Sequence, residues 1–521
     1  MITAFFVIVN FNIERIIIMK QMKLRILFMA ALLAAGTVVS ACGDASDQTP
    51  VETSGSVDTS AVTEAVTEDP RIPSSLPADL DLGGETINVW YFTKNSDAAE
   101  RFLDLVGDPE GDIVEESLYE RNMAVEEQLN MTFNYVDTGV LSGDVGASIR
   151  KVLMAGDTTY DLYNVIQWNS SKLALEHCFL NLADQELLAL DQPWWSQQYI
   201  ENMSIGSKSN IYFVTGDVSL DMIRCIGSMY FNKNLFTNLY DDADILYQEV
   251  LDGKWTHDRL LQYAEEGYMD LNGNSQIDDG DQYGLITNSF NNMDNFGFGM
   301  GSVFSRRDKD NMPYLTIEEE HNVAIYEKIY HMIAEAPGVL MNKVEPNPTL
   351  QNVEWFSEGK ALFLPGFLYT SENLRDMKDD YGIIPFPKFD ENQEEYLSSV
   401  HDIATLMCLP TTCTKVDAVC AVLEAMAYYS YYEVTPVYYE TALKTKYTRD
   451  DLSSQIIDLI HDSAMTDLAY VYQESLNGAG MIMRTLAANK TKDYASYAAK
   501  RVKANTRALE KFITNFEETI E

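Results

Sequence analysis

The chain has 521 residues and a formal net charge of −43 at pH 7. A field of this sign repels nucleic-acid phosphates and anionic lipid headgroups, so the composition argues against nucleic-acid binding. The length allows two or three lobes, each with a substantial core.

Residues 1–41 have the features of a bacterial export signal. A basic stretch at 20–25 precedes a 14-residue apolar segment at 26–39, which is shorter than the roughly 20 residues of a membrane span. The small residues Ser40 and Ala41 then lead to Cys42, and the four residues 39–42 resemble the lipobox of bacterial lipoproteins. We expect cleavage before Cys42 and lipidation of its thiol. The alternative to an export signal is a short apolar helix that happens to end in cysteine. Separately, residues 1–18 would not be translated if the true start codon lies after them.

The segment after Cys42 has the composition of an unfolded tether. Residues 43–83 contain no aromatic residue and one basic residue, Arg71, so they cannot bury enough apolar surface to fold. As a flexible coil they would span roughly 35 Å on average. We therefore assign 42–83 as a lipidated cysteine with a disordered acidic tether. Removal of four basic residues and one acidic residue with the leader places the mature chain near −46.

The remaining five cysteines are odd in number and form no CxxC pair. At least one of them must be unpaired in a monomer, so no disulfide framework is expected and buried thiols are favoured.

Strands and helices alternate from residue 86 to residue 178. The residue types predict strands over 86–92, 131–136 and 161–167, and helices over 112–129, 143–155 and 170–178. This alternation predicts an α/β lobe with a mainly parallel sheet. Ligands of such sheets bind at the carboxyl ends of the strands, which here are 91–95 and Trp168-Asn169.

The following elements are predicted in the order of the chain. We expect a hairpin over 204–214 with its turn near 207–210, a strand that turns into a helix over 229–236, and a helix from the N-cap Thr256 to about Gly267. Further along, we expect a helix that ends at Gly359 before a buried strand, and then a strand stopped by Pro385. The last expected element is an amphipathic helix over 486–521.

Four motifs resemble those of the extracellular solute-binding proteins of the sugar type, the substrate receptors of ABC importers. Residues 230–236 resemble the family's "YYNKDLF" element, and 254–261 resemble its "WTWDELL" helix start. Residues 356–361 resemble "FxxGKAAM", and 381–388 resemble "GVVPLPK". The four motifs follow the family's order and lie downstream of the lipobox, and the similarity extends from about residue 86 to the C-terminus.

The resemblance implies a two-lobed α/β fold of the periplasmic-binding-protein type (type II). Its lobes would be discontinuous in sequence, with 84–220 plus 396–432 in lobe 1 and 221–395 plus 433–521 in lobe 2. Hinge crossovers would lie at 217–227 and near Tyr396.

The resemblance also implies the function of a receptor rather than an enzyme. We expect a monomer, lipid-anchored on the extracellular face of the cell membrane, that captures a carbohydrate, in particular an oligosaccharide, and delivers it to an ABC permease. The alternatives are a peptide-binding receptor and a secreted glycoside hydrolase. The six histidines are scattered without metal spacing, and the chain contains no GxSxG or P-loop motif.

Sugar recognition requires aromatic platforms and hydrogen-bonding side chains, because sugars present apolar C–H faces ringed by hydroxyls. The aromatic candidates are Trp168, Trp194, Trp195 and Trp355, and the polar candidates are Asn169, Asp217 and Asp402. Among these, Trp168-Asn169 and Asp217 are preferred because each follows a predicted strand or hairpin. Burial in the core is the competing interpretation for every single tryptophan.

Residues 270–281 have the spacing of a calcium-binding loop. The ligand positions 1, 3, 5, 7, 9 and 12 correspond to Asp270, Asn272, Asn274, the carbonyl of Gln276, Asp278 and Asp281. Ser275 replaces the usual glycine at position 6, and Asp281 replaces the longer glutamate. We expect a single structural Ca²⁺ site; the alternative is a solvated turn rich in Asp and Asn.

Overall fold

The computed structural model describes residues 71–93, 104–205, 210–275, 278, 280–342, 347–440, 443 and 451–518. From Arg71 onward the chain forms one compact unit. The export signal and Cys42 lie outside the described residues. Within them, no helix is both long enough and apolar enough to span a bilayer.

The first sheet contains four strands in the order β12-β3-β1-β2. The bounds are Glu85–Thr93 for β1, Met131–Leu141 for β2, Leu162–Ile166 for β3 and Thr405–Cys408 for β12. The strands β2, β1 and β3 run parallel, and β12 joins β3 antiparallel. The prediction of a mainly parallel sheet is confirmed, and the fourth strand comes from more than two hundred residues further along the chain.

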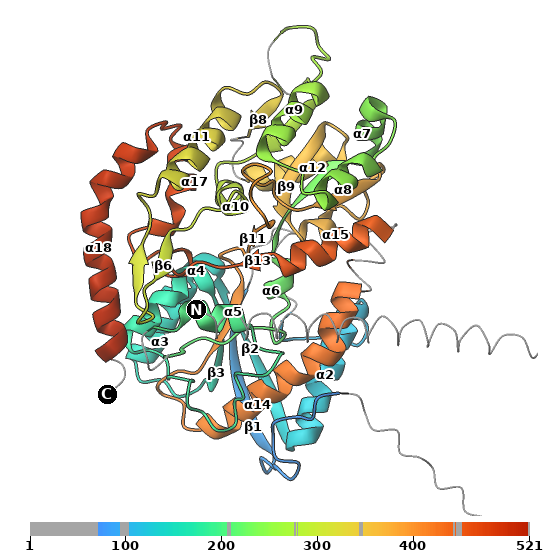
Figure 1. Cartoon of the computed structure of the whole chain (residues 1–521). Coiled ribbons are helices and arrows are strands. Elements are labelled where there is room, and N and C mark those ends of the chain that lie inside the picture. Colours follow the sequence, from blue (N-terminus) through green and yellow to red (C-terminus); the bar gives the residue numbers. More distant parts are fainter. Residues whose placement is uncertain are drawn as a thin grey trace, which may run out of the picture. The chain divides into compact units, whose positions relative to one another are not determined.

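Helices α2 (Ile113–Leu129) and α3 (Val145–Met154) follow β1 and β2, and α14 (Val416–Tyr429) packs against α2. Figure 1 shows these elements in the lower part of the view. Asp112 begins α2 with a capping box, in which its carboxylate accepts from the amides of Val114 and Glu115 while the Glu115 side chain accepts from the amide of Asp112.

Two features of this lobe differ from the sequence-based expectation. The expected hairpin at 204–214 does not form in the described residues: Val214 pairs with Met407, because a distant segment supplies its hydrogen-bond partner. Residues 71–83, which were expected to belong to the tether, are among the described residues and make contacts. Arg71 forms an ion pair with Glu433, and the Ser75 hydroxyl donates to Glu424, so the end of the expected tether is packed on the first lobe.

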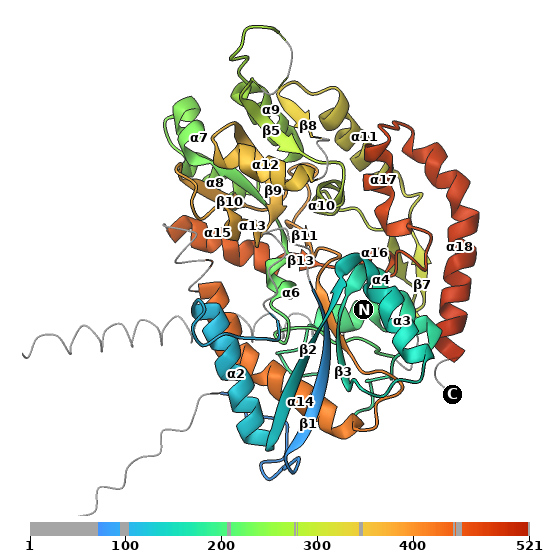
Figure 2. The same ribbon diagram turned by 180° about the vertical axis from the view of Figure 1, so that it is seen from behind.

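The second sheet contains five strands in the order β10-β4-β9-β5-β8. The bounds are Gly227–Asn232 for β4, Tyr283–Thr287 for β5, Val339–Met341 for β8, Ala361–Phe367 for β9 and Tyr381–Ile384 for β10. It is antiparallel from β10 to β9 and parallel from β9 to β8. Figure 2 shows β5, β8, β9 and β10 together in the upper part of the view.

Residues of the sequence motifs cap helices and fill the core of this second lobe. Asn232 caps α7 (Lys233–Tyr240) by accepting from the amide of Leu235, and Thr256 caps α9 (His257–Gly267). Trp255 is fully buried and donates its indole N–H to the carbonyl of Pro385 at 2.9 Å. The predicted strand-to-helix turn and the predicted N-cap are therefore confirmed.

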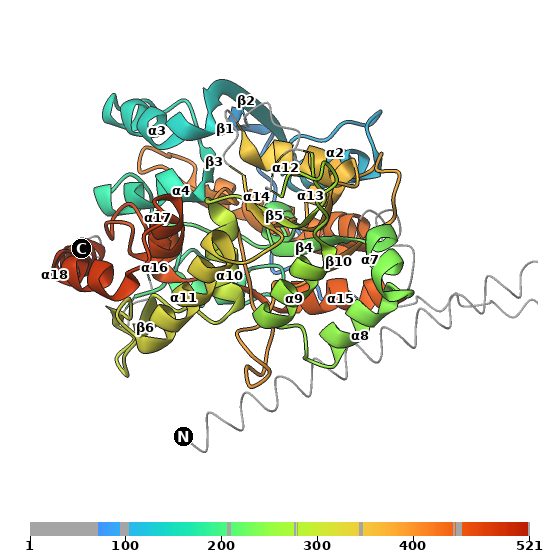
Figure 3. The same cartoon turned by 90° about the horizontal axis from the view of Figure 1, so that it is seen from above.

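The remaining elements surround the two sheets. They are α4 (Gln167–Ser170), α5 (Gln197–Met203), α6 (Asp221–Arg224), α8 (Asp244–Leu251), α10 (Asn291–Gly299), β6 (Ser305–Arg307), β7 (Pro313–Leu315), α11 (Glu320–Ala334), α12 (Pro348–Ser357), α13 (Thr370–Asn373), β11 (Ser398–Ser399), α15 (Asp451–Asp462), β13 (Ala464–Met465), α16 (Leu468–Val471), α17 (Ile482–Ala488) and α18 (Tyr494–Glu518). Helix α10 packs against both α11 and α17 (Figure 3).

The single helix expected at the C-terminus is interrupted between α17 and α18, where Lys490 has a φ of 47°. Helix α18 is therefore shorter than expected. Helix α18 contacts both halves of the unit. Tyr494 near its start donates to the carbonyl of Ile317, whereas the carbonyl of Phe516 accepts from Asn210 beside the first sheet. The assignment of all of 433–521 to lobe 2 stays a prediction.

Candidate functional site

The short helix α4 places Trp168 at the carboxyl end of β3. The amide of Trp168 donates to the carbonyl of Asp402 at 3.0 Å, and the preceding amide of Gln167 donates to Ala404 at 3.1 Å. Trp168 is half-buried. The structure thus joins two of the predicted ligand residues, Trp168 and Asp402, at the end of a central strand.

The carboxylate of Asp402 is the centre of a buried polar cluster. It lies 2.8 Å from Nδ1 of His401 and 3.2 Å from Arg484, and it accepts from Nε2 of Gln473 at 3.1 Å. Burial opposes ionisation of Asp402, but Arg484 and then His401 more than offset this effect and lower its pKa below the usual value. Asp402 is therefore held as an anion.

Arg484, on α17, extends this cluster to α10. Its guanidinium pairs with the carboxylate of Asp294 and donates to the hydroxyl of Tyr470 at 3.0 Å. Burial raises the pKa of Asp294 to about 7, with a further contribution from Asp402, while Arg484 works in the opposite direction. We call Asp294, His401, Asp402 and Arg484 the junction cluster.

Several buried polar atoms beside the junction cluster form no hydrogen bond within the described part of the chain. They are Oδ1 of Asp294, Oδ1 of Asn291 and Nε2 of Gln167. Nδ2 of Asn291 contacts Nε2 of His401. A buried donor or acceptor without a partner costs about 1–3 kcal/mol, so these atoms leave hydrogen-bonding capacity unused beside the junction cluster.

Trp194 and Trp195 are core residues of the first lobe rather than ligand platforms. Their side chains are 0% and 2% exposed. Each indole N–H donates at 3.0 Å to one carboxylate oxygen of Glu424 on α14. Neither ring face is accessible in this structure, so the competing interpretation, burial in the core, describes both residues.

The other three candidates occupy separate places. Asn169 is buried and donates to the carbonyl of Ser142, which holds α4 against the start of α3. Asp217 is half-buried, and burial raises its pKa to about 6 against the influence of Thr435 and His461. The rings of Trp355 and Tyr283 are stacked, with 6.0 Å between their centroids, where α12 packs on the second sheet.

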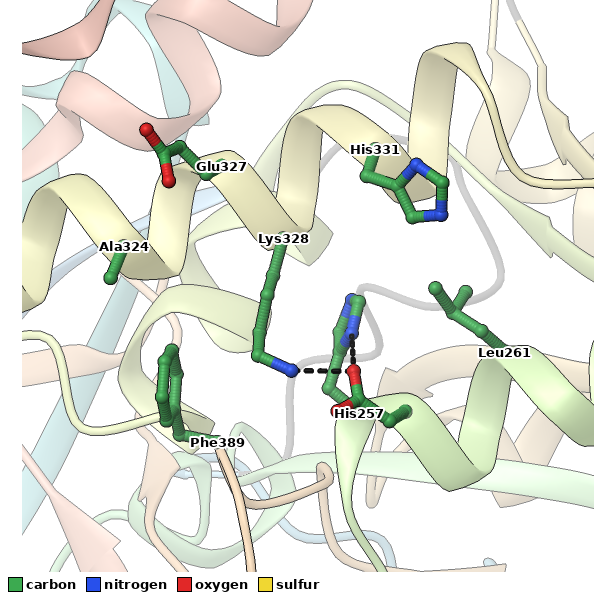
Figure 4. Close-up of a pocket in the computed structure, with 8 residues that line it drawn as sticks. His257, Leu261, Ala324, Glu327, Lys328, His331 and Phe389 are labelled. Carbon is green, nitrogen blue, oxygen red and sulfur yellow. Dashed lines mark hydrogen bonds and ion pairs between the residues drawn. The ribbon is translucent and has the colours of Figure 1, made fainter.

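A separate pocket of about 370 Å³ lies between α9 and α11 (Figure 4). Its lining includes His257, Asp258, Lys328, His331 and Phe389. Asp258 pairs with Lys328, and His257 is fully buried. All the lining residues belong to the expected second lobe, so this pocket does not provide contacts from both lobes.

Sequence reasoning identified only one member of the junction cluster, Asp402. Asp294, His401 and Arg484 come from α10, the crossover before β12, and α17, and they carry no motif. Their proximity arises from tertiary packing, and no local pattern in the sequence could have indicated it. In the described residues, no group of three or more His, Cys, Asp and Glu side chains has an arrangement that would hold a metal ion.

Comparison with known proteins identifies the fold. No family model and no curated protein matches the chain. Among solved structures, an ABC transporter solute-binding protein from Thermotoga lettingae bound with α-D-tagatose has a TM-score of 0.53 and 12% identity, and the match covers 82% of this chain and 100% of that one.

Two further structures give similar values. The GacH receptor of Streptomyces glaucescens, solved unliganded and with acarbose, has a TM-score of 0.51 and 12% identity and covers 82% of this chain and 99% of its own. UgpB from Mycobacterium tuberculosis, in complex with glycerophosphocholine, has a TM-score of 0.50 and 12% identity over 81% of this chain and 100% of its own. The expected two-lobed fold is confirmed.

Proposed function

We propose that this protein is the substrate receptor of an ABC importer and captures a carbohydrate between its two lobes. The observation that carries this proposal is the fold, which the chain shares along more than four-fifths of its length with solute-binding proteins. Two of these proteins were solved with a sugar or with acarbose. The proteins that share the fold are binding proteins, which favours capture over catalysis.

The junction cluster favours a neutral polyol over an anionic ligand. Arg484 is already paired with Asp294 and Asp402, so its positive charge is offset by two carboxyl groups. A phosphate or a peptide carboxylate placed here would face more negative than positive charge. Sugar hydroxyls can donate to carboxylates and accept from amides, and the half-buried Trp168 offers apolar surface beside them.

The same proposal includes the cell-surface location and the partners. Lipidation of Cys42 would moor the receptor beside a membrane permease, and the segment from Cys42 to Pro70 would serve as the tether. The receptor would act as a monomer. Ligand that bridges the lobes favours the closed state by its higher affinity for that state.

A thermal-shift panel of mono- and oligosaccharides tests the proposal. A ligand present at 100 times its Kd stabilises the folded state by about 2.7 kcal/mol. We expect at least one sugar to raise the melting temperature and Asp402→Asn to weaken its affinity ten-fold or more. Asp390→Asn is the control, because Asp390 only accepts from the amides of Asn392 and Gln393 in an exposed turn.

Other members of the panel decide between the alternatives. A response to oligopeptides alone would replace the proposal with a peptide receptor, and a response to glycerophosphocholine alone would overturn the charge argument. Formation of a shorter sugar during incubation would show that the protein is a glycoside hydrolase.

A further inference from the structure

The C-terminal helix α18 carries a row of basic side chains on one face. Lys500, Lys503, Arg507 and Lys511 follow one another at intervals of three or four residues. Because an α-helix turns by about 100° per residue, this spacing places the four residues in one arc of the helix surface, over a length of about 17 Å. All four side chains are exposed. We call these four residues the basic stripe.

The opposite face of α18 holds the helix on the protein. Asn505, Leu509, Phe512 and Phe516 are buried, and they lie about half a turn away from the basic stripe. Phe512 packs against Tyr472, with 4.8 Å between the ring centroids. Figures 1 and 2 show α18 along the outer edge of the compact unit. The apolar face is therefore used by the core, and the helix presents the basic stripe to solvent as a fixed row.

The fold does not neutralise the basic stripe. None of its four side chains forms an ion pair within the described part of the chain. Glu510 is the one carboxylate among the described side chains of α18. Other basic side chains are paired, as Lys328 is with Asp258. Positive charge on α18 thus remains available to a partner, in a chain whose net charge is −43.

The form of the basic stripe suits an extended anionic surface rather than a small anion. A small anion is bound where several donors converge on one point, whereas these four charges are spread along about 17 Å of an exposed helix face. The headgroups of an anionic bilayer present negative charge over a plane, and clustered Lys and Arg side chains are attracted to such a plane. The apolar face is buried, so this attraction would be electrostatic and without insertion.

The negative charge of the rest of the chain gives this attraction a direction. At physiological ionic strength, exposed charges are largely screened beyond about 8 Å. Headgroups in contact with α18 would therefore respond mainly to the basic stripe. Faces rich in carboxylates would be repelled by the same headgroups. The composition thus argues against attraction of the whole chain to anionic lipid, but it allows attraction at this one helix.

We propose that the basic stripe docks on anionic phospholipid headgroups and orients the receptor on the membrane. The setting rests on the proposed lipid anchor. Residues 43–70, between Cys42 and the described unit, would span roughly 30 Å as a flexible coil. A tether of this reach keeps the local concentration of α18 near the bilayer high, so a weak attraction is sufficient. The docking does not depend on the nature of the transported ligand.

Co-sedimentation with lipid vesicles tests the docking. The mature chain, residues 42–521, is made without the export signal, so that no lipid is attached. We expect its partition into vesicles of equal parts phosphatidylglycerol and phosphatidylcholine to exceed that into pure phosphatidylcholine roughly thirty-fold or more, and to fall as salt is added. Lys503→Gln combined with Arg507→Gln should lower the partition about 25-fold, because each basic residue near an anionic surface contributes about five-fold.

Lys254→Gln combined with Lys378→Gln is the matched control. Both lysines are exposed and lie outside α18, and the pair changes the net charge by the same amount. This control should keep the wild-type partition within a factor of two. Glutamine is nearly as good a helix former as lysine and arginine, so the melting temperatures of both double variants should match that of the wild type.

Equal partition of the wild type into the two kinds of vesicle would overturn the proposal. Equal losses in the two double variants would also overturn it, because the net charge rather than the basic stripe would then be responsible. Binding of soluble polyglutamate without any binding of vesicles would replace the lipid surface with an acidic protein partner. The assay contains no sugar, so its failure would leave the proposed receptor function untouched.

Discussion

At the residue scale, the junction cluster shows how burial and pairing give two carboxyl groups opposite properties. Asp294 and Asp402 both contact Arg484 and are both buried. Asp402 also contacts His401 and Gln473, and its pKa falls, whereas Asp294 retains a buried oxygen without a hydrogen bond and its pKa rises to about 7. The difference follows from the number of groups that stabilise each anion.

The raised pKa of Asp294 predicts a specific pH dependence of stability. An unfolded aspartate has a pKa near 3.9, so the folded state binds this proton more tightly. The resulting stabilisation is complete below about pH 4 and is lost as the pH rises through 7, with a slope of at most about 1.4 kcal/mol per pH unit. Asp294→Asn should flatten the profile of unfolding free energy between pH 4 and 7, as measured by urea titration.

Asp402 contributes with the opposite sign in a different window. Its lowered pKa stabilises the fold above about pH 4, and this contribution is lost as the pH falls below that value. The pH range in which Asp402 changes the stability therefore lies below the range in which Asp294 changes it. An unchanged slope between pH 4 and 7 in Asp294→Asn would contradict the assignment of that slope to Asp294.

At the scale of elements, α14 holds the first lobe together through one buried acid. Glu424 accepts from the indoles of Trp194 and Trp195, from the amide of Ala189 and from the hydroxyl of Ser75. Burial raises its pKa, and the four donors partly counter this rise. The helix thereby connects the segment around Ser75 with the loop before α5.

Replacement of Glu424 with glutamine tests this role of α14. The new amide would face indole and backbone donors with an N–H group, so at least one donor would lose its acceptor. Hydrogen bonds to charged groups contribute about 1.5–3 kcal/mol each, and we expect a loss of that size in the unfolding free energy. Denaturant titration followed by tryptophan fluorescence measures it. Glu120→Gln, on the exposed side of α2, should change little.

At the scale of the whole molecule, the two sheets meet through crossovers that carry buried polar links. Ile226 pairs with Val400 between the sheets. Beside them Arg224 forms ion pairs with Asp221 and Glu372, all of them buried. A closing motion needs a few crossover residues to change their dihedral angles while such links persist. The proposed capture of ligand by relative motion of the lobes would use these crossovers.

The Cys42→Ala variant separates anchoring from binding. Without the thiol no lipid can be attached, so we expect the protein to move from the membrane fraction to the soluble fraction. Ligand affinity in solution should match that of the wild type within a factor of two. A marked loss of affinity would show that the anchor has a role in binding beyond tethering.

The sequence by itself determined the features that depend on local or ordered patterns. The alternation of strands and helices predicted a mainly parallel first sheet, and Asn232 and Thr256 cap the helices that the motifs indicated. These features are predictable because side-chain periodicity and capping act over a few residues.

Only the tertiary structure decided which residues share a site. Residues 168, 294, 402 and 484 meet because four segments, each separated from the next by 82 to 126 residues in the sequence, pack together. The same packing buried Trp194 and Trp195, whose aromatic character alone suited a sugar platform equally well. Residue type determines which contacts a side chain can make, and long-range packing determines whether it faces a ligand or the core.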